Sequence, residues 1–301
     1  MEKIKIAIVG FGNVGKKVYE AVEESPDMET AGIVELAHLI EKLKVNIPNV
    51  PVVDNIEKLG KVDVAILAID SRHVPNTAPI YLDMGINTVN AYDIHGDSMI
   101  ELKESLDKIS KEKNTVSIMA SGWDPGTDSI IRAVLEMIAP KGLTTVNFGP
   151  GMSMGHTVAV KATPGVKDAI SITVPKGMGL HKRLVYIELE DGYDFNEVSK
   201  AIKDDSYFNQ DETYVFCVDN VKSLIDMGHG VHIERKGVSG ITHNQKMDFT
   251  MSLTNPAATA QVMVSAARAS LKQNPGCYTL IEIPPIDCIY GERMSLIKRF
   301  V

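Results

Sequence analysis

The 301-residue sequence is poor in the features that mark several other protein classes. It has no basic excess: 39 acidic residues outnumber 31 lysines and arginines, and the formal net charge of −8 argues against nucleic-acid binding. It has no apolar run near the ~20 residues of a membrane helix. It also lacks the basic, apolar and small-residue segments of a secretory signal. We therefore expect a soluble, cytoplasmic protein with no membrane or nucleic-acid partner.

Cysteine is also scarce. Cys217, Cys277 and Cys288 occur in neither a C-x-x-C nor a zinc-site spacing, so we expect them to be buried small apolar residues in a reducing compartment. The histidines do not suggest a metal site either. His229 and His232 would point to opposite faces of a strand, and no third ligand is evident, so no bound metal is expected.

What the sequence does contain is a complete dinucleotide-binding pattern at its N-terminus. The apolar strand pattern of residues 3–9 is followed by a G-x-G-x-x-G turn, a helix pattern, a second apolar run at residues 30–34 and an acid, Glu35. The first glycine permits a tight turn, the second lets the backbone approach a pyrophosphate, and the third lets the helix pack closely on the strand. The turn consists of Gly10, Phe11, Gly12, Asn13, Val14 and Gly15. This pattern predicts a nicotinamide-dinucleotide site.

The first 120 residues alternate strand and helix patterns. Apolar strands are expected at residues 62–69, 87–90 and 115–119, and helices at 16–24 and 98–112. This alternation predicts an α/β fold with a Rossmann-like, doubly wound parallel sheet. Ligands bind such sheets beyond the carboxyl ends of the strands. The segments there are Asp70-Ser71, Tyr92-Asp93 and Gly122-Trp123-Asp124-Pro125-Gly126.

The pattern changes after about residue 145. Residues 184–190 and 246–253 alternate apolar and polar side chains, which is typical of an antiparallel sheet with one covered face. Helices are expected at 195–203 and 257–272. We therefore expect a dinucleotide-binding domain at residues 1–120 and a substrate-binding and oligomerisation domain at 121–259, α+β with a mostly antiparallel sheet. The segment from about 260 to 301, which includes the stretch at 279–283, is expected to pack back on the first domain.

Several polar residues could carry chemistry, and the residues alone leave their roles open. Asp124 or Thr127 could be the N-cap of a helix at 129–138, or the acid beside the only tryptophan could belong to a site. His229, between two glycines, could approach a ligand closely or simply occupy a turn. Asn255 could cap the helix that Pro256 begins. The glycine-dense segment 149–156 is not a P-loop but could form a pocket wall.

Taken together, these segments resemble the meso-diaminopimelate dehydrogenase family over essentially the full length of the chain. The matching segments are Gly10–Gly15, Tyr92-Asp93-Ile94-His95, Gly122-Trp123-Asp124-Pro125-Gly126, Phe148-Gly149-Pro150-Gly151, His156, His181-Lys182-Arg183, Gly228-His229-Gly230 and Asn255-Pro256. The Gly-Trp-Asp-Pro-Gly and Phe-Gly-Pro-Gly segments are far more specific than a dinucleotide turn.

The resemblance implies reversible oxidative deamination of the D-centre of meso-2,6-diaminopimelate to L-2-amino-6-oxopimelate and ammonia, with hydride transfer to NAD(P). It implies that Asp93 and Asp124 are catalytic and hold the D-amino acid end, with Phe148 as an aromatic wall and Met154 and Gly155 beside that end. It implies that the distal L-end is bound by Thr173, Arg183, His229 and Asn255. Besides the glycine-rich turn and Glu35, the cofactor would contact Ala68, Ile69, Asp70, Ser71, Ala91, Tyr92, Asp93, Trp123, Pro125 and Gly126.

The chain departs from the family pattern where NADP-dependent members carry paired arginines. Here the stretch reads Glu35-Leu36-Ala37-His38, and a carboxylate suits a free ribose 2′-OH and repels a 2′-phosphate. His38, Lys42 or Lys44 could supply positive charge. NADP is thus the family expectation and NAD the expectation from Glu35. Met154 replaces the glutamine of other members, which could relax specificity.

The shortened segment between residues 175 and 181 is typical of a branch of the family that forms larger assemblies. A homo-oligomer, a dimer or larger, is therefore expected. The alternatives are a dehydrogenase or reductive aminase of another D-amino acid or 2-keto acid and, from a different class, a cofactor-binding sensor without catalysis.

Overall fold

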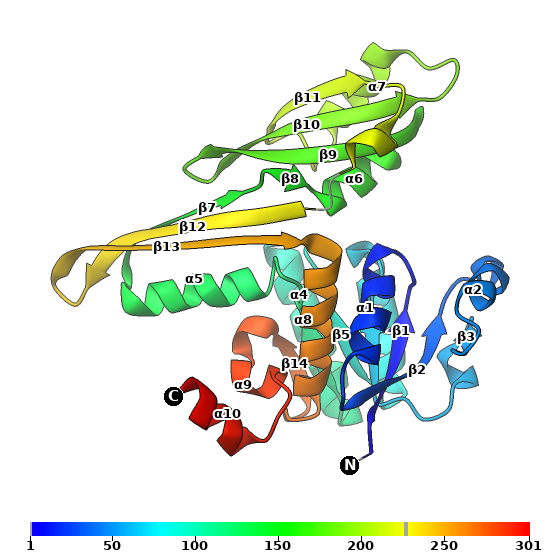
Figure 1. Cartoon of the computed structure of the whole chain (residues 1–301), viewed down its shortest axis with the longest axis vertical. Helices are drawn as coiled ribbons and strands as arrows, with labels where there is room; N and C mark the ends of the chain where they lie inside the picture. Colours follow the sequence, from blue (N-terminus) through cyan, green and yellow to red (C-terminus); the bar gives the residue numbers. More distant parts are fainter. Residues whose placement is uncertain (1, 226–227) are drawn as a thin grey trace. The chain divides into compact units, whose positions relative to one another are not determined.

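The computed structural model describes residues 2–225 and 228–301, which form two compact units (Figure 1). The first comprises Met1–Ala133 and Pro256–Val301, and the second comprises Val134–Asn255. These divisions differ from the expected boundaries after residues 120 and 259. They fall within two helices, α5 (Thr127–Ile138) and α8 (Asn255–Ser270), because the first turns of α5 and most of α8 belong to the first unit.

The first unit contains a parallel sheet of seven strands in the order β14-β6-β5-β4-β1-β2-β3. Its strands are β1 (Ile4–Val9), β2 (Met28–Val34), β3 (Val52–Val53), β4 (Val64–Leu67), β5 (Asn87–Asn90), β6 (Val116–Met119) and β14 (Gly276–Thr279). The chain runs outward from β1 in both directions, which is the doubly wound arrangement. The predicted α/β class is confirmed.

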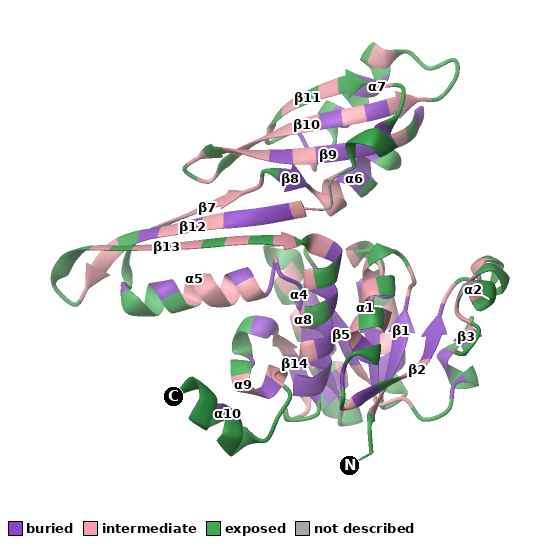
Figure 2. Ribbon diagram, viewed as in Figure 1, coloured by how far each residue is buried: buried purple, intermediate pink, exposed green. Residues whose placement is uncertain are grey.

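Helices cover both faces of this sheet. Besides α8 and the start of α5, the helices of the unit are α1 (Asn13–Glu23), α2 (Ile40–Asn46), α3 (Val74–Asp83), α4 (Asp97–Lys113), α9 (Pro285–Cys288) and α10 (Arg293–Phe300). Alternate residues of β1 enter separate cores: Ile6 and Ile8 pack with α1 and α8, and Ala7 and Val9 pack with α3 and α4. Because both faces are covered, the central strands are almost wholly buried (Figure 2).

The C-terminal segment completes the sheet of the first unit. β14 pairs in parallel with β6 and places Gly276 opposite Val116. Arg268 of α8 is 6% exposed and donates two hydrogen bonds to Asp27, of 2.6 and 2.8 Å, at the start of β2. Burial alone would raise the pKa of Asp27, but the hydrogen bond and charge of Arg268 lower it. This ion pair joins residues far apart in the sequence.

The second unit has a four-stranded sheet, β11-β10-β9-β8, and a three-stranded sheet, β13-β12-β7. The strands are β7 (Lys141–Phe148), β8 (Gly151–Met152), β9 (Val166–Gly177), β10 (Leu180–Leu189), β11 (Glu212–Cys217), β12 (Gly228–Ser239) and β13 (Thr242–Thr254). All neighbours are antiparallel except β10 and β11. Helices α6 (Met154–Lys161) and α7 (Phe195–Asp204) share an apolar core with β9 and β10. The predicted α+β character is confirmed.

The expectation for the cysteines was wrong at one position. Cys277 in β14 is buried and Cys288 is partly buried, but Cys217 is exposed. Cys217 ends β11, which lies at the edge of the four-stranded sheet, so one side of this strand faces no neighbour.

Candidate functional site

The parallel sheet brings the expected cofactor residues to one edge. β1, β2, β4, β5 and β6 run in the same direction, so the segments that follow them lie at the same edge. These segments begin at Gly10, Glu35, Ala68, Ala91 and Ala120. They carry the glycine-rich turn, Ile69, Asp70 and Ser71, then Tyr92 and Asp93, and finally Trp123, Pro125 and Gly126.

The three glycines of the N-terminal turn have the geometry that a dinucleotide site needs. Gly10 has a φ of +86°, and a Cβ there would lie 2.7 Å from the carbonyl oxygen of Ala68. A Cβ at Gly15 would lie 2.1 Å from the carbonyl oxygen of Gly10, so α1 can approach β1 only with glycine at this position. A Cβ at Gly12 would meet no atom within 4 Å, which leaves open space beside the turn.

The N-terminus of α1 is suited to an anion. The helix begins after Gly12, which has no side chain that could accept hydrogen bonds from the first N–H groups of the helix. The first turn, which includes Asn13 and Val14, carries no acidic residue. Free backbone N–H groups and the helix dipole favour a phosphate at such a position. These observations fit the pyrophosphate of a dinucleotide.

Glu35 is fixed next to this turn. One carboxylate oxygen accepts a hydrogen bond of 2.8 Å from Phe11 N, and the other accepts one of 2.9 Å from Leu36 N. The carboxylate therefore bridges the end of β2 and the glycine-rich turn, and it is not a freely rotating surface group.

Ser71 links the segments that follow β4 and β5. Its hydroxyl donates to Asp93 Oδ1 over 2.6 Å and accepts from Asp93 N over 3.2 Å. The carboxylate of Asp93 is otherwise exposed. An exposed, oriented carboxylate can accept hydrogen bonds from an ammonium group.

The Gly122–Gly126 segment forms a tight turn between β6 and α5. Trp123 is 3% exposed, and Gly122 N donates to Pro125 O over 3.0 Å. A Cβ at Gly126 would lie 1.9 Å from Gly122 O, so only glycine fits there. The Thr127 hydroxyl donates to Trp123 O and so does not cap the helix N-terminus.

Asp124 has an unusual electrostatic environment. Burial raises its pKa to about 7, and the negative charges of Asp128 and Asp93 act in the same direction, while Arg132 opposes them. Asp128 and Arg132 were not among the expected site residues. Asp128 and Arg132 follow Asp124 at intervals of four residues. This spacing could have indicated both residues from the sequence, once the start of the helix was known.

In the second unit, Arg183 and Thr173 are opposite one another on β10 and β9. Arg183 Nη1 donates to the Thr173 hydroxyl, and its Nε donates to Asp211 Oδ2 over 2.6 Å. Asp211 lies just before β11 and follows no recognisable motif, so the sequence did not indicate it. The ion pair holds the guanidinium of Arg183 in a fixed direction.

Two neutral histidines flank this arginine. Phe148 N donates to His181 Nε2 over 2.8 Å, and burial followed by the charge of Arg183 lowers the pKa of His181. Burial and Arg183 likewise lower the pKa of His156 to about 4, and its Nδ1 lies 2.8 Å from the Ser153 hydroxyl. The Phe148 and His181 rings are 5.7 Å apart, so Phe148 is held in place beside the Arg183 strand.

Glycines bring His229 to the same region of the second unit. A Cβ at Gly149 would lie 2.4 Å from Thr173 O, and a Cβ at Gly151 would lie 2.2 Å from Gly228 O. The segment therefore passes closely between β9 and β12. His229, in β12, is 8% exposed.

The remaining expected residues occupy ends of elements in this unit. Met154 and Gly155 begin α6, directly after β8. Asn255 follows Thr254, which pairs with Gly228, so Asn255 adjoins the end of β12 that carries His229. Backbone pairing thus places Phe148, Thr173, Arg183, His229 and Asn255 on neighbouring strands or at their ends.

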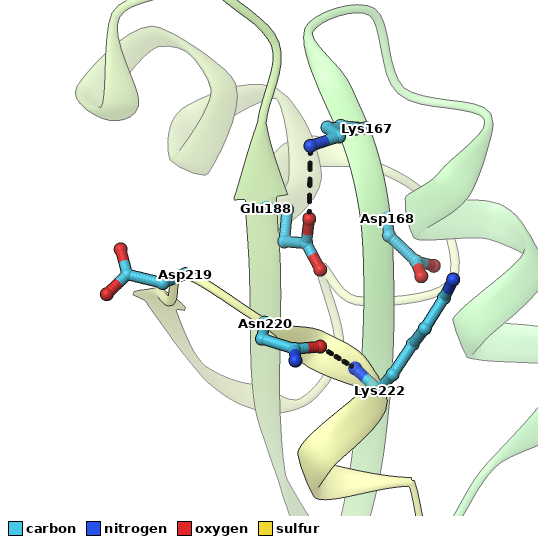
Figure 3. Close-up of a pocket in the computed structure, with 6 residues that line it drawn as sticks. All are labelled: Lys167, Asp168, Glu188, Asp219, Asn220 and Lys222. Atoms are coloured by element: carbon cyan, nitrogen blue, oxygen red, sulfur yellow. Dashed lines mark hydrogen bonds and ion pairs between the residues drawn. The ribbon is translucent and has the colours of Figure 1, made fainter.

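A separate hollow of about 430 Å³ lies on the second unit (Figure 3). Its residues are Lys167, Asp168, Glu188, Asp219, Asn220 and Lys222, none of which was an expected site residue. Its charges are largely paired: Lys167 lies 3.5 Å from Glu188, and Asp168 lies 2.6 Å from Lys161. We therefore place the chemistry elsewhere.

Two features are absent from the described ranges 2–225 and 228–301. No group of three or more His, Cys, Asp or Glu side chains in them could hold a metal ion. None of their helices is both long enough and apolar enough to cross a membrane. His229 and His232 lie in β12 at odd and even positions, and so on opposite faces.

The glycine geometry leads to a prediction with a matched pair of variants. Gly12→Ala places a methyl group in open space beside the turn, so the fold should be kept and dinucleotide binding weakened. Gly15→Ala forces α1 away from β1, so the melting temperature should fall together with binding. Calorimetric titration with the dinucleotide and thermal unfolding distinguish the two variants. Unchanged dinucleotide binding by Gly12→Ala would show that the pyrophosphate lies elsewhere.

Comparisons with known proteins agree with this geometry. A model of the diaminopimelic acid dehydrogenase C-terminal domain family matches residues 122–182. The chain is 54% identical over 301 residues, 100% of both chains, to a protein of Bacteroides fragilis named meso-diaminopimelate D-dehydrogenase. The solved structure of C. glutamicum DAP dehydrogenase in complex with DAP superposes with a TM-score of 0.88 and 26% identity, covering 100% of both chains.

An engineered D-amino acid dehydrogenase bound to NADP+ has the same fold, with a TM-score of 0.86 and 24% identity over 99% of this chain and 100% of that one. The full-length identity to the Bacteroides fragilis protein is far above what a shared fold alone requires. The chain is therefore a nicotinamide-dependent oxidoreductase and belongs to the meso-diaminopimelate D-dehydrogenase family.

Proposed function

We propose that this protein catalyses the reversible oxidative deamination of the D-centre of meso-2,6-diaminopimelate to L-2-amino-6-oxopimelate and ammonia. The observation that carries the proposal is the 54% identity over the whole chain to a relative with this name. The geometry supports it, because the first unit presents oriented carboxylates and the second presents a fixed guanidinium. A substrate with two ammonium and two carboxylate groups needs both kinds of partner.

In this proposal, Asp93 and Asp124 bind the ammonium group of the D-centre. Ser71 orients Asp93 through the 2.6 Å hydrogen bond, and the tight turn holds Asp124. The nicotinamide cofactor, when bound, supplies the hydride acceptor. Asp124, with a pKa of about 7, accepts the proton that the ammonium group must lose, because a general base works best with a pKa near the operating pH.

The distal L-amino acid end is bound by Thr173, Arg183, His229 and Asn255 in the second unit. Phe148 forms an aromatic wall, and Met154 and Gly155 lie beside the D-end. The two ends of the substrate are chemically identical except for configuration, so discrimination depends on placement. Polar groups arranged for the L-end would be left unpaired by a wrong end, which disfavours binding strongly.

For the cofactor, we propose that NAD is used at least comparably with NADP. The two hydrogen bonds that hold Glu35 support this, because a fixed carboxylate cannot turn away from a 2′-phosphate. Of the nearby cations, Lys44 lies 2.8 Å from Glu41 and so is engaged elsewhere. Besides the turn and Glu35, the residues proposed to contact the cofactor are Ala68, Ile69, Asp70, Ser71, Ala91, Tyr92, Asp93, Trp123, Pro125 and Gly126.

We also infer that the chain works in the cytoplasm as a homo-oligomer, a dimer or larger. Large apolar side chains exposed on α5 and β7 support self-association: Val134, Met137, Ile138 and Leu143.

The substrate proposal predicts stereospecific turnover. The purified protein should reduce NAD or NADP with meso-diaminopimelate and release ammonia, whereas the L,L isomer, which has no D-centre, should give no reduction. Initial rates with these isomers and with a panel of simple D-amino acids measure the specificity. If a different D-amino acid is turned over and meso-diaminopimelate is not, the substrate assignment is wrong and the alternative dehydrogenase function holds.

Arg183→Ala and His229→Ala should chiefly weaken recognition of the distal end. Loss of a charged hydrogen-bond partner costs on the order of 2–3 kcal/mol, or about tenfold to a few hundredfold in kcat/KM. The matched control is Lys182→Ala, which removes a cation from the opposite face of β10 and should leave the rate unchanged. Wild-type kcat/KM for either site variant would remove that residue from the proposed site.

Cofactor preference gives a separate test. Replacing Glu35 and Leu36 with arginines should shift the ratio of kcat/KM values toward NADP, because two cations then replace a carboxylate at the ribose. If the natural protein already prefers NADP by more than about a hundredfold, roughly 2.7 kcal/mol, the argument from Glu35 fails.

A further inference from the structure

Beside Asp124, helix α5 carries an ion pair between a buried acid and a partly exposed arginine, to which the proposed reaction assigns no role. Asp128 is wholly buried, and its Oδ2 lies 2.9 Å from Arg132 Nη2. Its Oδ1 accepts a hydrogen bond of 3.1 Å from the Ser129 hydroxyl. A carboxylate so far from water requires a specific partner.

The backbone fixes Asp124 against this pair. Asp128 N donates to Trp123 O over 2.9 Å, and Thr127 N donates to Gly122 O over 3.2 Å. The turn and the first residues of α5 are therefore one hydrogen-bonded unit. Within it, the negative charge of Asp128 acts on Asp124 and, next after burial, raises the pKa of that carboxyl group. Two carboxyl groups so close in one turn cannot both be ionised at low energetic cost.

The surroundings decide which carboxyl carries the proton. Asp128 lies in the first turn of α5, where the helix dipole favours an anion, and it is paired with Arg132. Asp124 has no such partner of its own in this cluster, and it also faces the negative charge of Asp93 from the segment after β5. Asp124 is therefore the carboxyl group of this cluster whose pKa rises, to about 7.

We propose that Asp128 and Arg132 are positioning residues that keep one exchangeable proton at Asp124, for transfer to and from the amino nitrogen of the substrate's D-centre. The inference rests on the proposed function. In deamination, ionised Asp124 takes one proton from the ammonium group. The freed lone pair forms the C=N bond as the Cα–H hydrogen leaves with its electron pair to the oxidised nicotinamide. Water then adds to the C=N bond, and ammonia leaves. In the reverse direction, protonated Asp124 returns the proton to nitrogen.

The two partners should move the pH profile in opposite directions. Deamination needs ionised Asp124, so its kcat/KM should rise with pH through about pH 7. Asp128→Asn removes the neighbouring negative charge and should move this rise down by about one pH unit or more. It should also lower kcat in the plateau on the order of tenfold, because Asp124 becomes a weaker base. Arg132→Met removes the opposing positive charge and should move the rise upward.

The matched control is Glu104→Gln, which removes one exposed carboxylate of α4 and should leave the profile unchanged. A second measurement needs no turnover: 13C NMR titration of the full-length protein labelled at aspartate carboxyl carbons. The wild-type protein should show one carboxyl group that titrates near pH 7. That signal should be absent in Asp124→Asn and should titrate at lower pH in Asp128→Asn.

The outcomes separate the inference from the proposed function. If the enzyme is active but no carboxyl group titrates between about pH 6 and 8, the proposed role of Asp128 is wrong and the proposed function is unaffected. An Asp128→Asn enzyme with the wild-type pH profile would lead to the same conclusion. If a carboxyl group titrates near pH 7 but the protein turns over no D-amino acid, the proposed function is wrong. The catalytic role of the cluster is then wrong as well. If Asp128→Asn does not fold, Arg132→Met and the wild-type titration still decide the question.

Discussion

The close approach of α1 to the end of β1 is the constraint on which the first unit depends. Gly15 lies where any Cβ would meet the carbonyl oxygen of Gly10 at 2.1 Å, so the helix can start directly above the strand. This places the free N–H groups of α1 at the carboxyl edge of the sheet, between β4 and β2. The other parallel strands then deliver Glu35, Ser71 and Asp93 to the same edge. The edge that we propose as the dinucleotide site therefore depends on one backbone contact.

The second unit uses glycine for a different purpose. Gly149 and Gly151 let one segment pass against the backbones of Thr173 and Gly228, which belong to two separate sheets. Thr173 is opposite Arg183, and Gly228 precedes His229. Polar groups from distant parts of the chain thereby come together. Asp211 then fixes the guanidinium of Arg183, so the group is oriented before any ligand arrives.

The carboxyl groups of the first unit show how environment divides roles between identical side chains. Asp93 is exposed and bound to a hydroxyl, so it remains an ordinary acceptor for a cation. Asp124 is held against Asp128, and burial together with that charge raises its pKa to about 7. Asp27 faces Arg268, which lowers its pKa despite burial. The chemistry of each acid follows from its neighbours, which are remote in the sequence or one helical turn away.

The sequence by itself determined the fold class and the dinucleotide turn, because both depend on local patterns. Apolar strands alternating with helices predict a covered parallel sheet, and G-x-G-x-x-G meets its steric requirements within six residues.

Tertiary structure decided the rest. The strand of the C-terminal segment lies at Gly276–Thr279 because it completes the sheet beside β6, a pairing with no local signal. Cys217 is exposed at the end of the edge strand β11, which its local sequence does not indicate. The contacts of Arg183 with Asp211 and of Asp124 with Asp128 likewise depend on side-chain packing and burial, which residue patterns do not encode locally.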